Sequence, residues 1–335
     1  MHNRTQTTDN TPIPGAQLMH LDLVRVQQHI TAAQERGRYT GSPDPIEYLV
    51  QQQCVVDVDG ALIPTLAGIL VFAGDPERWL PGTSGIDLAQ FSGPDPRSTT
   101  LSFFEQIREP IFTAIERTVE LLWARSEHDY RVDGAQRVEE HTYPRVVLRE
   151  LTVNALCHRD WASAGSRIRI QMFPQAIEWI SPGSLPEGIT IANMLDMQNS
   201  RNPILSALLF QAGYIEGFGL GMNTVYATLR ETQSEPPYLD NSAHAFTIRV
   251  KGKPLRPSTT TAVNIADRRL TTICTLLQQR GPLTAVDLAA ILNVSRRTLL
   301  RDLTDLIAQG KVQSIGATRN LHYAYIAEGN SRHPS

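Results

Sequence analysis

Residues 143–160 read YPRVVLRELTVNALCHRD, and this stretch decides the fold. Pro144 suits the first turn of a helix, where its missing N–H is not needed. The residues after it are apolar around most of the helical cylinder, which is typical of a buried helix. Glu150, Asn154 and His158 follow one another at intervals of four, so they form one polar stripe. Because burying such groups unpaired costs free energy, the stripe must meet either another part of the fold or a ligand.

The sequence alternates between apolar and polar residues after this helix. SRIRIQMF at residues 166–173 and the run at 176–181 predict two strands, and residues 245–250 predict another. This order of elements predicts an antiparallel or mixed sheet with helices on one face, and therefore an α+β fold. Helices between these strands are expected at about 191–196, 204–211 and 222–232.

The residues before the central helix predict smaller elements. Residues 20–36 and a short segment through Tyr48 predict helices, two β-rich runs around Asp59-Gly60 predict a hairpin, and residues 64–72 predict a compact helix. The order helix, helix, hairpin, helix suggests a small winged-helix-like unit. A strand is expected at 85–91.

One long helix is predicted by the apolar spacing at residues 101–125, with a kink or break at Pro110. Residues 1–19 are polar and lack a period, and residues 251–264, KGKPLRPSTTTAVN, are typical of a linker. The chain is therefore expected to be multi-domain. The predicted segments are a disordered N-terminus at 1–19, a small winged-helix-like α+β unit at 20–100, the main domain at 101–250, the linker at 251–264 and a C-terminal module at 265–328.

Composition narrows the class of protein. The chain of 335 residues is long enough for two or three domains. No apolar run approaches the roughly 20 residues that a membrane span needs, so no membrane partner is expected. The three cysteines are far apart and form no C-x-x-C pair, which argues against a zinc site or a disulfide framework and favours a cytoplasmic location.

Charge is distributed unevenly along the chain. From Lys251 onward there are twelve basic and five acidic residues, a net charge of +7, although the whole chain has −3. The rest of the chain therefore carries −10. A basic module attached to an acidic body suggests that only the module meets a polyanion.

The C-terminal module has the pattern of a winged helix-turn-helix. An amphipathic helix at 267–279 is followed by a short helix at 285–292, a turn, and a second helix at 296–309 that Ser295 can cap and Gly310 can end. Two β-rich runs follow and predict a two-stranded wing. The sequence VSRRTLLRDL also resembles winged helix-turn-helix repressors of the DeoR type.

Double-stranded DNA is the partner that this module predicts. The start of the second helix enters the major groove in this motif, and arginine can pair with a guanine edge or a phosphate. A solvated basic face or a protein-binding module are the alternatives. A homodimer is expected, because such proteins commonly bind paired half-sites. The candidate DNA-binding residues are Ser295, Arg296, Arg297, Thr298, Arg301 and Arg319.

The main domain resembles a known family through five motifs. These are RELTVNALCHRD at 149–160, ISPGSLPEG at 180–188, SRNP at 200–203, YIEGFGLGM at 214–222 and PTLAGILVF at 64–72. They are similar to a group of bacterial transcriptional regulators with a RecG helicase C-terminal-like region. That resemblance implies the GHKL ATPase fold of gyrase and histidine kinases, an α/β two-layer sandwich.

The resemblance also implies roles for the polar stripe. Glu150 would orient the attacking water, Asn154 would help to hold Mg²⁺, and His158 would lie at the nucleotide site. Gly217, Gly219 and Gly221 could let backbone N–H groups approach phosphate. ATP with Mg²⁺ is the implied cofactor, and carboxylate and amide oxygens suit this chemistry.

One departure from the family concerns the aspartate that reads adenine. Residues 181–185, SPGSL, contain no Asp. We therefore favour a structural or degenerate site over an active ATPase. The sequence predicts a DNA-binding transcriptional regulator whose GHKL-like domain oligomerises. Whether this domain also binds a nucleotide stays open at this point. The alternative is an ATP-hydrolysing, helicase-labelled protein acting on DNA, although the G-x-x-x-x-G-K-[ST] loop of translocating helicases is absent.

Overall fold

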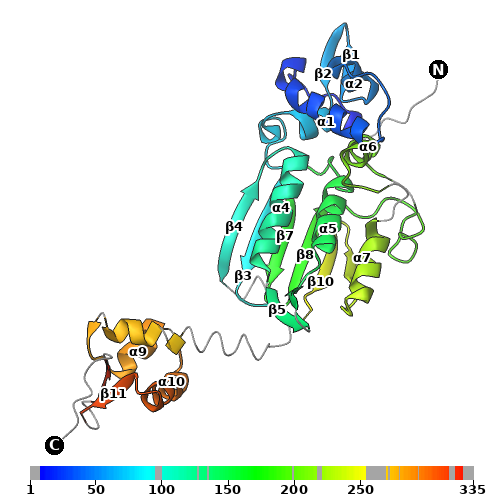
Figure 1. Cartoon of the computed structure of the whole chain (residues 1–335). Coiled ribbons are helices and arrows are strands. Elements are labelled where there is room, and N and C mark those ends of the chain that lie inside the picture. Colours follow the sequence, from blue (N-terminus) through cyan, green and yellow to red (C-terminus); the bar gives the residue numbers. More distant parts are fainter. Residues whose placement is uncertain are drawn as a thin grey trace, which may run out of the picture. The chain divides into compact units, whose positions relative to one another are not determined.

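The computed structural model shows two compact units (Figure 1). The first comprises Met1–His128 and His141–Pro254, and the second comprises Asp129–Glu140 and Leu255–Ser335. The structure describes residues 8–94, 100–126, 128–133, 136–197, 200–216, 221–253, 269–270, 272–278, 280–292, 294–316 and 321–326.

A six-stranded sheet forms the centre of the first unit, in the order β4-β3-β7-β8-β10-β9. β3 and β7 pair in parallel, and the other neighbours pair antiparallel, so the sheet is mixed. This confirms the α+β class that the alternating periods predict. The strands are β3 (Ile86–Phe91), β4 (Leu101–Ile107), β7 (Ile168–Phe173), β8 (Ala176–Pro182), β9 (Tyr238–Asn241) and β10 (Ala245–Lys251).

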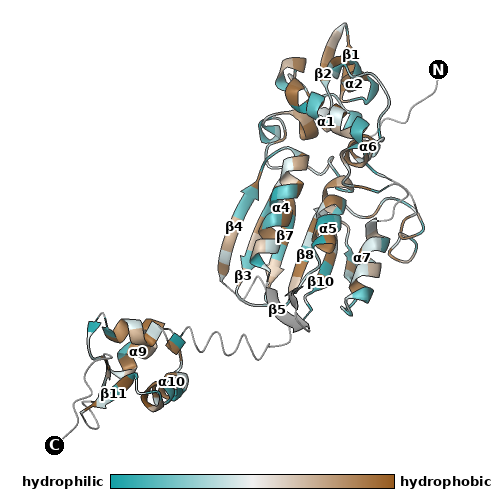
Figure 2. Ribbon diagram, viewed as in Figure 1, coloured by the Kyte–Doolittle hydropathy of each residue, from teal (hydrophilic) through white to brown (hydrophobic). Residues whose placement is uncertain are grey.

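Helices α4 (Ile111–Arg125), α5 (Arg145–Cys157) and α7 (Gly221–Glu231) cover one face of this sheet, which gives two layers (Figure 1). α5 lies between the other two and contacts both. α4 and α5 each carry hydrophobic and hydrophilic residues (Figure 2), as expected for helices that pack one face on a sheet. In β7, Ile168 and Ile170 are fully buried and the intervening Arg169 is exposed.

The residues before the sheet fold as helix, helix, hairpin and helix, as the sequence predicts. Asp59 and Gly60 have positive φ angles of 53° and 84°, which the two-residue turn of the hairpin requires. The apolar core of this region is continuous with that of the sheet. The elements are α1 (Leu23–Glu35), α2 (Pro45–Gln51), β1 (Val55–Val58), β2 (Ala61–Pro64) and α3 (Leu66–Phe72), and α6 (Pro203–Ala212) packs against α1.

The prediction of disorder at residues 1–19 is wrong for residues 8–19, and residues 1–7 lie outside the described part. Ile13 is buried in the core. Asp9 is fully buried, and its carboxylate accepts hydrogen bonds from the N–H groups of Ile204 (2.7 Å) and Leu205 (3.1 Å) at the start of α6. These free N–H groups favour a carboxylate, so a partner 195 residues away orders this polar segment.

The single helix predicted at residues 101–125 is also wrong. The structure contains strand β4 and then helix α4, and Pro110 immediately precedes α4 instead of kinking a longer helix. β4 pairs with β3, so the domain boundary predicted at residue 100 falls between two paired strands of one sheet. The pairing partner decides this conformation, and local apolar spacing does not reveal it.

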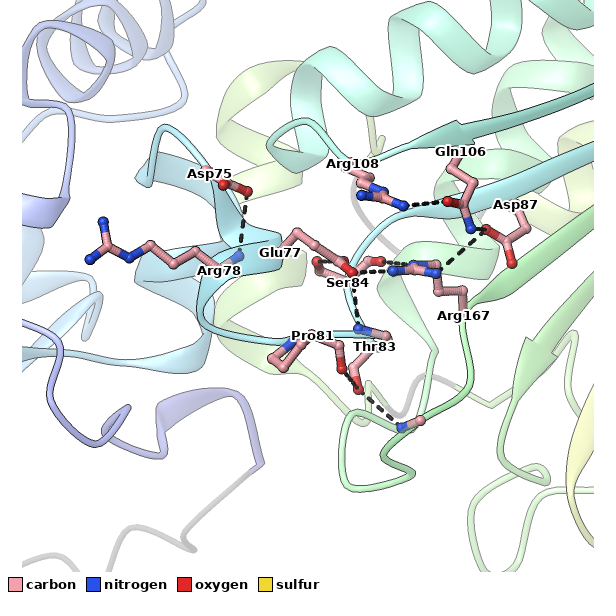
Figure 3. A network of polar contacts seen from close by, with 12 residues as sticks. Asp75, Glu77, Arg78, Pro81, Thr83, Ser84, Asp87, Gln106, Arg108 and Arg167 are labelled. Atoms are coloured by element: carbon pink, nitrogen blue, oxygen red, sulfur yellow. Dashed lines mark hydrogen bonds and ion pairs between the residues drawn. The ribbon is translucent and has the colours of Figure 1, made fainter.

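A network of polar contacts joins the segment before β3 to the sheet (Figure 3). Arg167, directly before β7, pairs with the carboxylate of Glu77 and donates its Nε–H to the carbonyl of Ser84 at 3.0 Å. Burial alone would raise the pKa of Glu77, but hydrogen bonds from Gly82, Ser84 and Arg167 outweigh burial and lower it. The network therefore links the N-terminal region firmly to the sheet.

The second unit contains the helix-turn-helix and wing that the sequence predicts. The described residues from 269 to 280 are helical and precede α9 (Ala285–Leu292) and α10 (Arg296–Ala308). β11 (Val312–Ile315) and β12 (His322–Tyr325) pair antiparallel as the wing. The linker predicted at 251–264 lies outside the described residues from 254 onward. A separate hairpin of β5 (His128–Asp133) and β6 (Gln136–His141) was not predicted.

Three further observations concern the described residues. The three cysteines are free, and Cys54 and Cys157 are buried. None of the helices described is long and apolar enough to cross a membrane. Within the same residues, no group of three or more His, Cys, Asp and Glu side chains is arranged to hold a metal ion.

Candidate functional site

α5 carries most of the polar stripe predicted at residues 143–160. The helix starts directly after Pro144, whose φ of −63° suits a helix start, and ends at Cys157, so His158 is its C-cap residue. Nine of its thirteen residues are buried, which confirms that the helix is covered on most sides. Glu150 is among them, with 7% of its surface exposed.

A cavity of about 460 Å³ lies beside α5 in the first unit. This volume is within the range of small-molecule sites, roughly 300–1,000 Å³. Its walls come from α5, α6, α7, β8, β10 and the loop after β8. The polar part of the lining includes Glu150, Asn154, His158 and Glu216, and the apolar part includes Met194, Met197, Phe210, Ile215 and Phe246.

Glu150 is the more buried of the two carboxylates that line the cavity. Its Oε1 accepts a hydrogen bond from Nη2 of Arg149 at 2.8 Å. No hydrogen bond reaches Oε2 from the described residues. Burial raises the pKa of Glu150, Arg149 lowers it, and the charge of Glu216 raises it. The carboxylate therefore holds its proton more tightly than an exposed glutamate does.

Asn154 lies one turn further along α5, next to the start of α7. Its Nδ2 is buried and has no hydrogen-bond partner among the described residues. A Cβ on Gly221 would lie 3.1 Å from Oε2 of Glu150, which is a tight contact, and 3.4 Å from Oδ1 of Asn154, so Gly221 lies close to both side chains. The structure thus brings together three of the predicted nucleotide-site residues. Gly217 and Gly219 lie outside the described residues.

His158 and its neighbour Arg159 have different surroundings. His158 lines the cavity, and the protein atoms that surround its ring, together with the charge of Arg201, lower its pKa. Arg159 is fully buried and donates to the carbonyls of Asp160 (2.9 Å) and Ser163 (3.0 Å). It therefore holds the loop after α5 and does not line the cavity.

The segment that lacks the adenine-reading aspartate is closely packed. The hydroxyl of Ser181 donates to the carbonyl of Ala155 in α5 at 2.8 Å, so this side chain is already engaged. Gly183 has a φ of +100°, and a Cβ there would lie 2.4 Å from Cβ of Asp160 and 2.5 Å from Nη1 of Arg201. These residues therefore provide no side chain suited to bind adenine. No lysine or arginine is among the described lining residues either, so the lining offers a triphosphate no cationic side chain.

Asn202 is a positioning residue that the sequence did not reveal. It is fully buried, and its Nδ2 donates to the carbonyls of Cys157 and Arg159, both at 2.8 Å. These bonds fix the C-terminal end of α5. The SRNP motif at 200–203 marks this residue in the sequence but does not indicate its role.

α10 presents the predicted DNA-binding residues. Ser295 caps the helix, because its Oγ accepts a hydrogen bond from the N–H of Thr298 at 3.2 Å. Arg297 is exposed, and the Arg301 side chain is 70% exposed. The opposite face is buried through Leu299, Leu303 and Leu306. Arg296 is the first residue of α10, but its side chain is not described, and Arg319 lies outside the described residues.

An ion pair that the sequence did not reveal fixes α10 in its module. Asp302 is only 2% exposed and lies beside Leu303 on the buried side of α10. Its Oδ1 accepts a hydrogen bond from Nη2 of Arg269 at 2.9 Å, and its Oδ2 contacts Nε of the same arginine. The first helix of the module is thereby linked to α10. The sequence signal for this ion pair is a charged residue, Asp302, on the side of the helix that the apolar pattern predicts to be buried.

Family comparisons agree with this division of the chain. Residues 165–250 match the family described as "Putative ATP-dependent DNA helicase recG C-terminal", and residues 268–324 match the family described as "HTH domain". These matches show the RecG C-terminal-like and helix-turn-helix architecture that the sequence motifs predict. The second match supports DNA as a partner. The first begins after α5, so Glu150 and Asn154 lie outside it.

A solved structure supports the fold. The chain is similar to the DIP2311 protein from Corynebacterium diphtheriae, with 18% identity and a TM-score of 0.60. The similarity covers 96% of this chain, which spans 65% of the length of that protein. No curated protein matches the chain. At this identity the likeness shows the fold alone.

Proposed function

We propose that the chain is a transcriptional regulator that binds an operator in double-stranded DNA through α10 and the wing of β11 and β12. The observation that carries this proposal is the pair of exposed arginines, Arg297 and Arg301, on a helix whose other face is fixed by apolar packing and Asp302. Arginines at these positions can contact base edges or phosphates when the helix enters the major groove. The helix-turn-helix match supports the same reading.

The regulator acts as a homodimer in the cytoplasm in this proposal. Two copies would place two recognition helices on half-sites about 34–36 Å apart, one turn of DNA. The basic charge from Lys251 onward, +7 against −10 for the rest, restricts DNA contact to the module. A footprint of the bound complex is therefore expected to show two protected half-sites related by a two-fold axis.

The test uses DNA from the locus that encodes the chain. Binding of the full chain to overlapping fragments is measured by fluorescence anisotropy at several salt concentrations, with shuffled fragments of equal length as controls. One or more natural fragments should bind at least about tenfold more tightly than their shuffled versions at moderate salt. Equal binding to natural and shuffled fragments would contradict operator recognition, and a flat salt dependence would contradict phosphate contact.

The first unit is the sensing part of this regulator. Its cavity is lined by Asn154, whose buried Nδ2 has no hydrogen-bond partner among the described residues, and a ligand that satisfied this donor would favour one state of the protein. A nucleotide with Mg²⁺ is one candidate, with Asn154 and Glu150 nearest to the ion and Gly221 nearest to the phosphates. The engaged hydroxyl of Ser181 weakens this candidate.

A second candidate function is slow ATP hydrolysis, which the placement of Glu150 beside Asn154 and Gly221 favours. Phosphate release from ATP and Mg²⁺ is measured for the full chain and for Glu150→Ala, with the exposed Glu231→Ala as a matched control. Turnover that is lost only in Glu150→Ala supports hydrolysis. Equal release by all three proteins removes it.

A further inference from the structure

We propose that the cavity beside α5 binds a small organic cation, an amine that carries a neighbouring hydroxyl oxygen and an apolar body. The inference rests on the proposed function in one respect only, because the amine is then the effector of the regulator. The site itself follows from the charges, the unpartnered atoms and the apolar surface of the cavity.

The charge of the lining selects a cation. Two carboxylates, Glu150 and Glu216, line the cavity, and the described lining includes no lysine or arginine. Arg149 contacts only Oε1 of Glu150, and Oε2 receives no hydrogen bond from the described residues. An ammonium group would supply a charge-assisted hydrogen bond to this oxygen. A triphosphate would instead bring negative charge toward both carboxylates.

The unpartnered amide of Asn154 favours a ligand that carries an acceptor oxygen close to its amine. Its buried Nδ2 is a donor without an acceptor in the described part of the chain. Asn154 and Glu150 both lie close to Gly221, which places the two groups side by side on one wall. A hydroxyl one or two carbons from the ammonium could accept the amide N–H while the ammonium binds Glu150.

The rest of the lining selects an apolar body. Met194, Met197, Phe210, Ile215 and Phe246 contribute the apolar part of the wall. Methionine is flexible and polarisable, so such a wall adapts to an aromatic or branched group. A bare divalent ion would need about six oxygen ligands and would leave this apolar surface unused.

Isothermal titration calorimetry of the full chain tests the proposal with four probes. These are 2-amino-1-phenylethanol, the neutral isostere 1-phenylethane-1,2-diol, Mg²⁺ alone and ATP with Mg²⁺. The amino alcohol should bind at least about tenfold more tightly than the diol, which corresponds to about 1.4 kcal/mol. Glu150→Gln and Glu216→Gln should each weaken the amino alcohol. Glu235→Gln should not, because Glu235 is an exposed carboxylate paired with Lys251 and does not line the cavity.

Several results would overturn the site. They are equal binding of the amino alcohol and the diol, no binding of either, binding of ATP or Mg²⁺ alone in place of the amine, or an unchanged affinity in both variants. Glu216 is exposed, so Glu216→Gln keeps the test valid if Glu150→Gln fails to fold. DNA binding is measured on the same samples. Amine binding without DNA binding contradicts the proposed function and supports the site, and the reverse result contradicts the site alone.

Discussion

Helices α5 and α10 have the same length, thirteen residues each, but they differ in how much of their surface is exposed. α5 buries nine of its residues, including Glu150, and its Glu150 and Asn154 line a cavity. α10 buries one apolar face and holds Arg297 and Arg301 out toward solvent. The polar groups of α5 that line the cavity can bind only a ligand small enough to be enclosed. The exposed arginines of α10 can contact a macromolecule. In the proposed function, the two helices therefore divide ligand sensing from DNA recognition.

Each helix is also fixed by a buried polar residue whose partners local periodicity does not reveal. Asn202 holds the end of α5 through two carbonyls, and Asp302 holds α10 through Arg269. Rigid support of this kind keeps functional side chains in place.

The largest effect is expected when the support of α10 is removed. Asp302→Ala leaves Arg269 without its buried partner and should lower the free energy of unfolding of the winged helix by about 3 kcal/mol. Asp305→Ala on the same helix is the matched control, because Asp305 is exposed. Chemical denaturation followed by circular dichroism measures both. Equal stabilities would show that the pair does not hold α10.

A pH effect is expected in the first unit and not in the winged helix. His29 on α1 is 6% exposed, and its Nε2 lies 3.3 Å from Oε1 of Gln211 on α6, a helix that borders the cavity. Burial lowers its pKa from 6.5 to about 4, the hydrogen bond to Gln211 opposes this, and Arg36 adds to it. The unfolded chain therefore binds a proton that the folded chain excludes. Stability should fall as the pH drops from about 6.5 toward 4, by about 2 kcal/mol at pH 5.

The measurement is urea denaturation of the full chain at pH 7.5 and pH 5, compared with His29→Gln. The loss of stability should be confined to the transition of the first unit and should shrink in the variant. A loss of the same size in His29→Gln would assign the pH dependence to other groups.

The smallest effect is expected at the end of β8, beside α5. Ser181→Ala removes the donor to the carbonyl of Ala155 and should lower the free energy of unfolding of the first unit by about 1 kcal/mol. Because this hydroxyl is engaged, amine binding to the cavity should change little. Thermal shift and calorimetry measure the two quantities. A strong loss of amine affinity at unchanged stability would show that Ser181 faces the ligand instead of the fold.

The sequence predicted those parts of the fold that depend on local signals. Pro144 marks the start of α5, Ser295 the cap of α10, and Asp59-Gly60 the hairpin turn, and each signal acts within a few residues. β4 was mistaken for a helix because pairing with β3 decides its conformation. Asp9 is held in place by a hydrogen bond from an N–H group at the start of α6, far along the chain.

The positions of Glu150 and Asn154 on α5 were predictable from the sequence, but their surroundings were not. The spacing of Glu150 and Asn154 places both on one side of α5, as the structure shows. Their environment depends on tertiary contacts, namely the approach of Gly221 and the engagement of Ser181 with the α5 backbone. Spacing along one helix carries no information about either contact, so the character of the cavity could be read only from the structure.

The division between the two helices is tested most directly by DNA affinity in two sets of variants. Fluorescence anisotropy is measured with the best-bound natural fragment for Arg297→Ala with Arg301→Ala, for Glu150→Gln, and for Arg280→Ala, an exposed arginine outside α10. The double variant should lose at least about tenfold in affinity and show a weaker salt dependence. Glu150→Gln and Arg280→Ala should bind DNA as the unchanged chain does. Unaltered binding by the double variant would contradict the account.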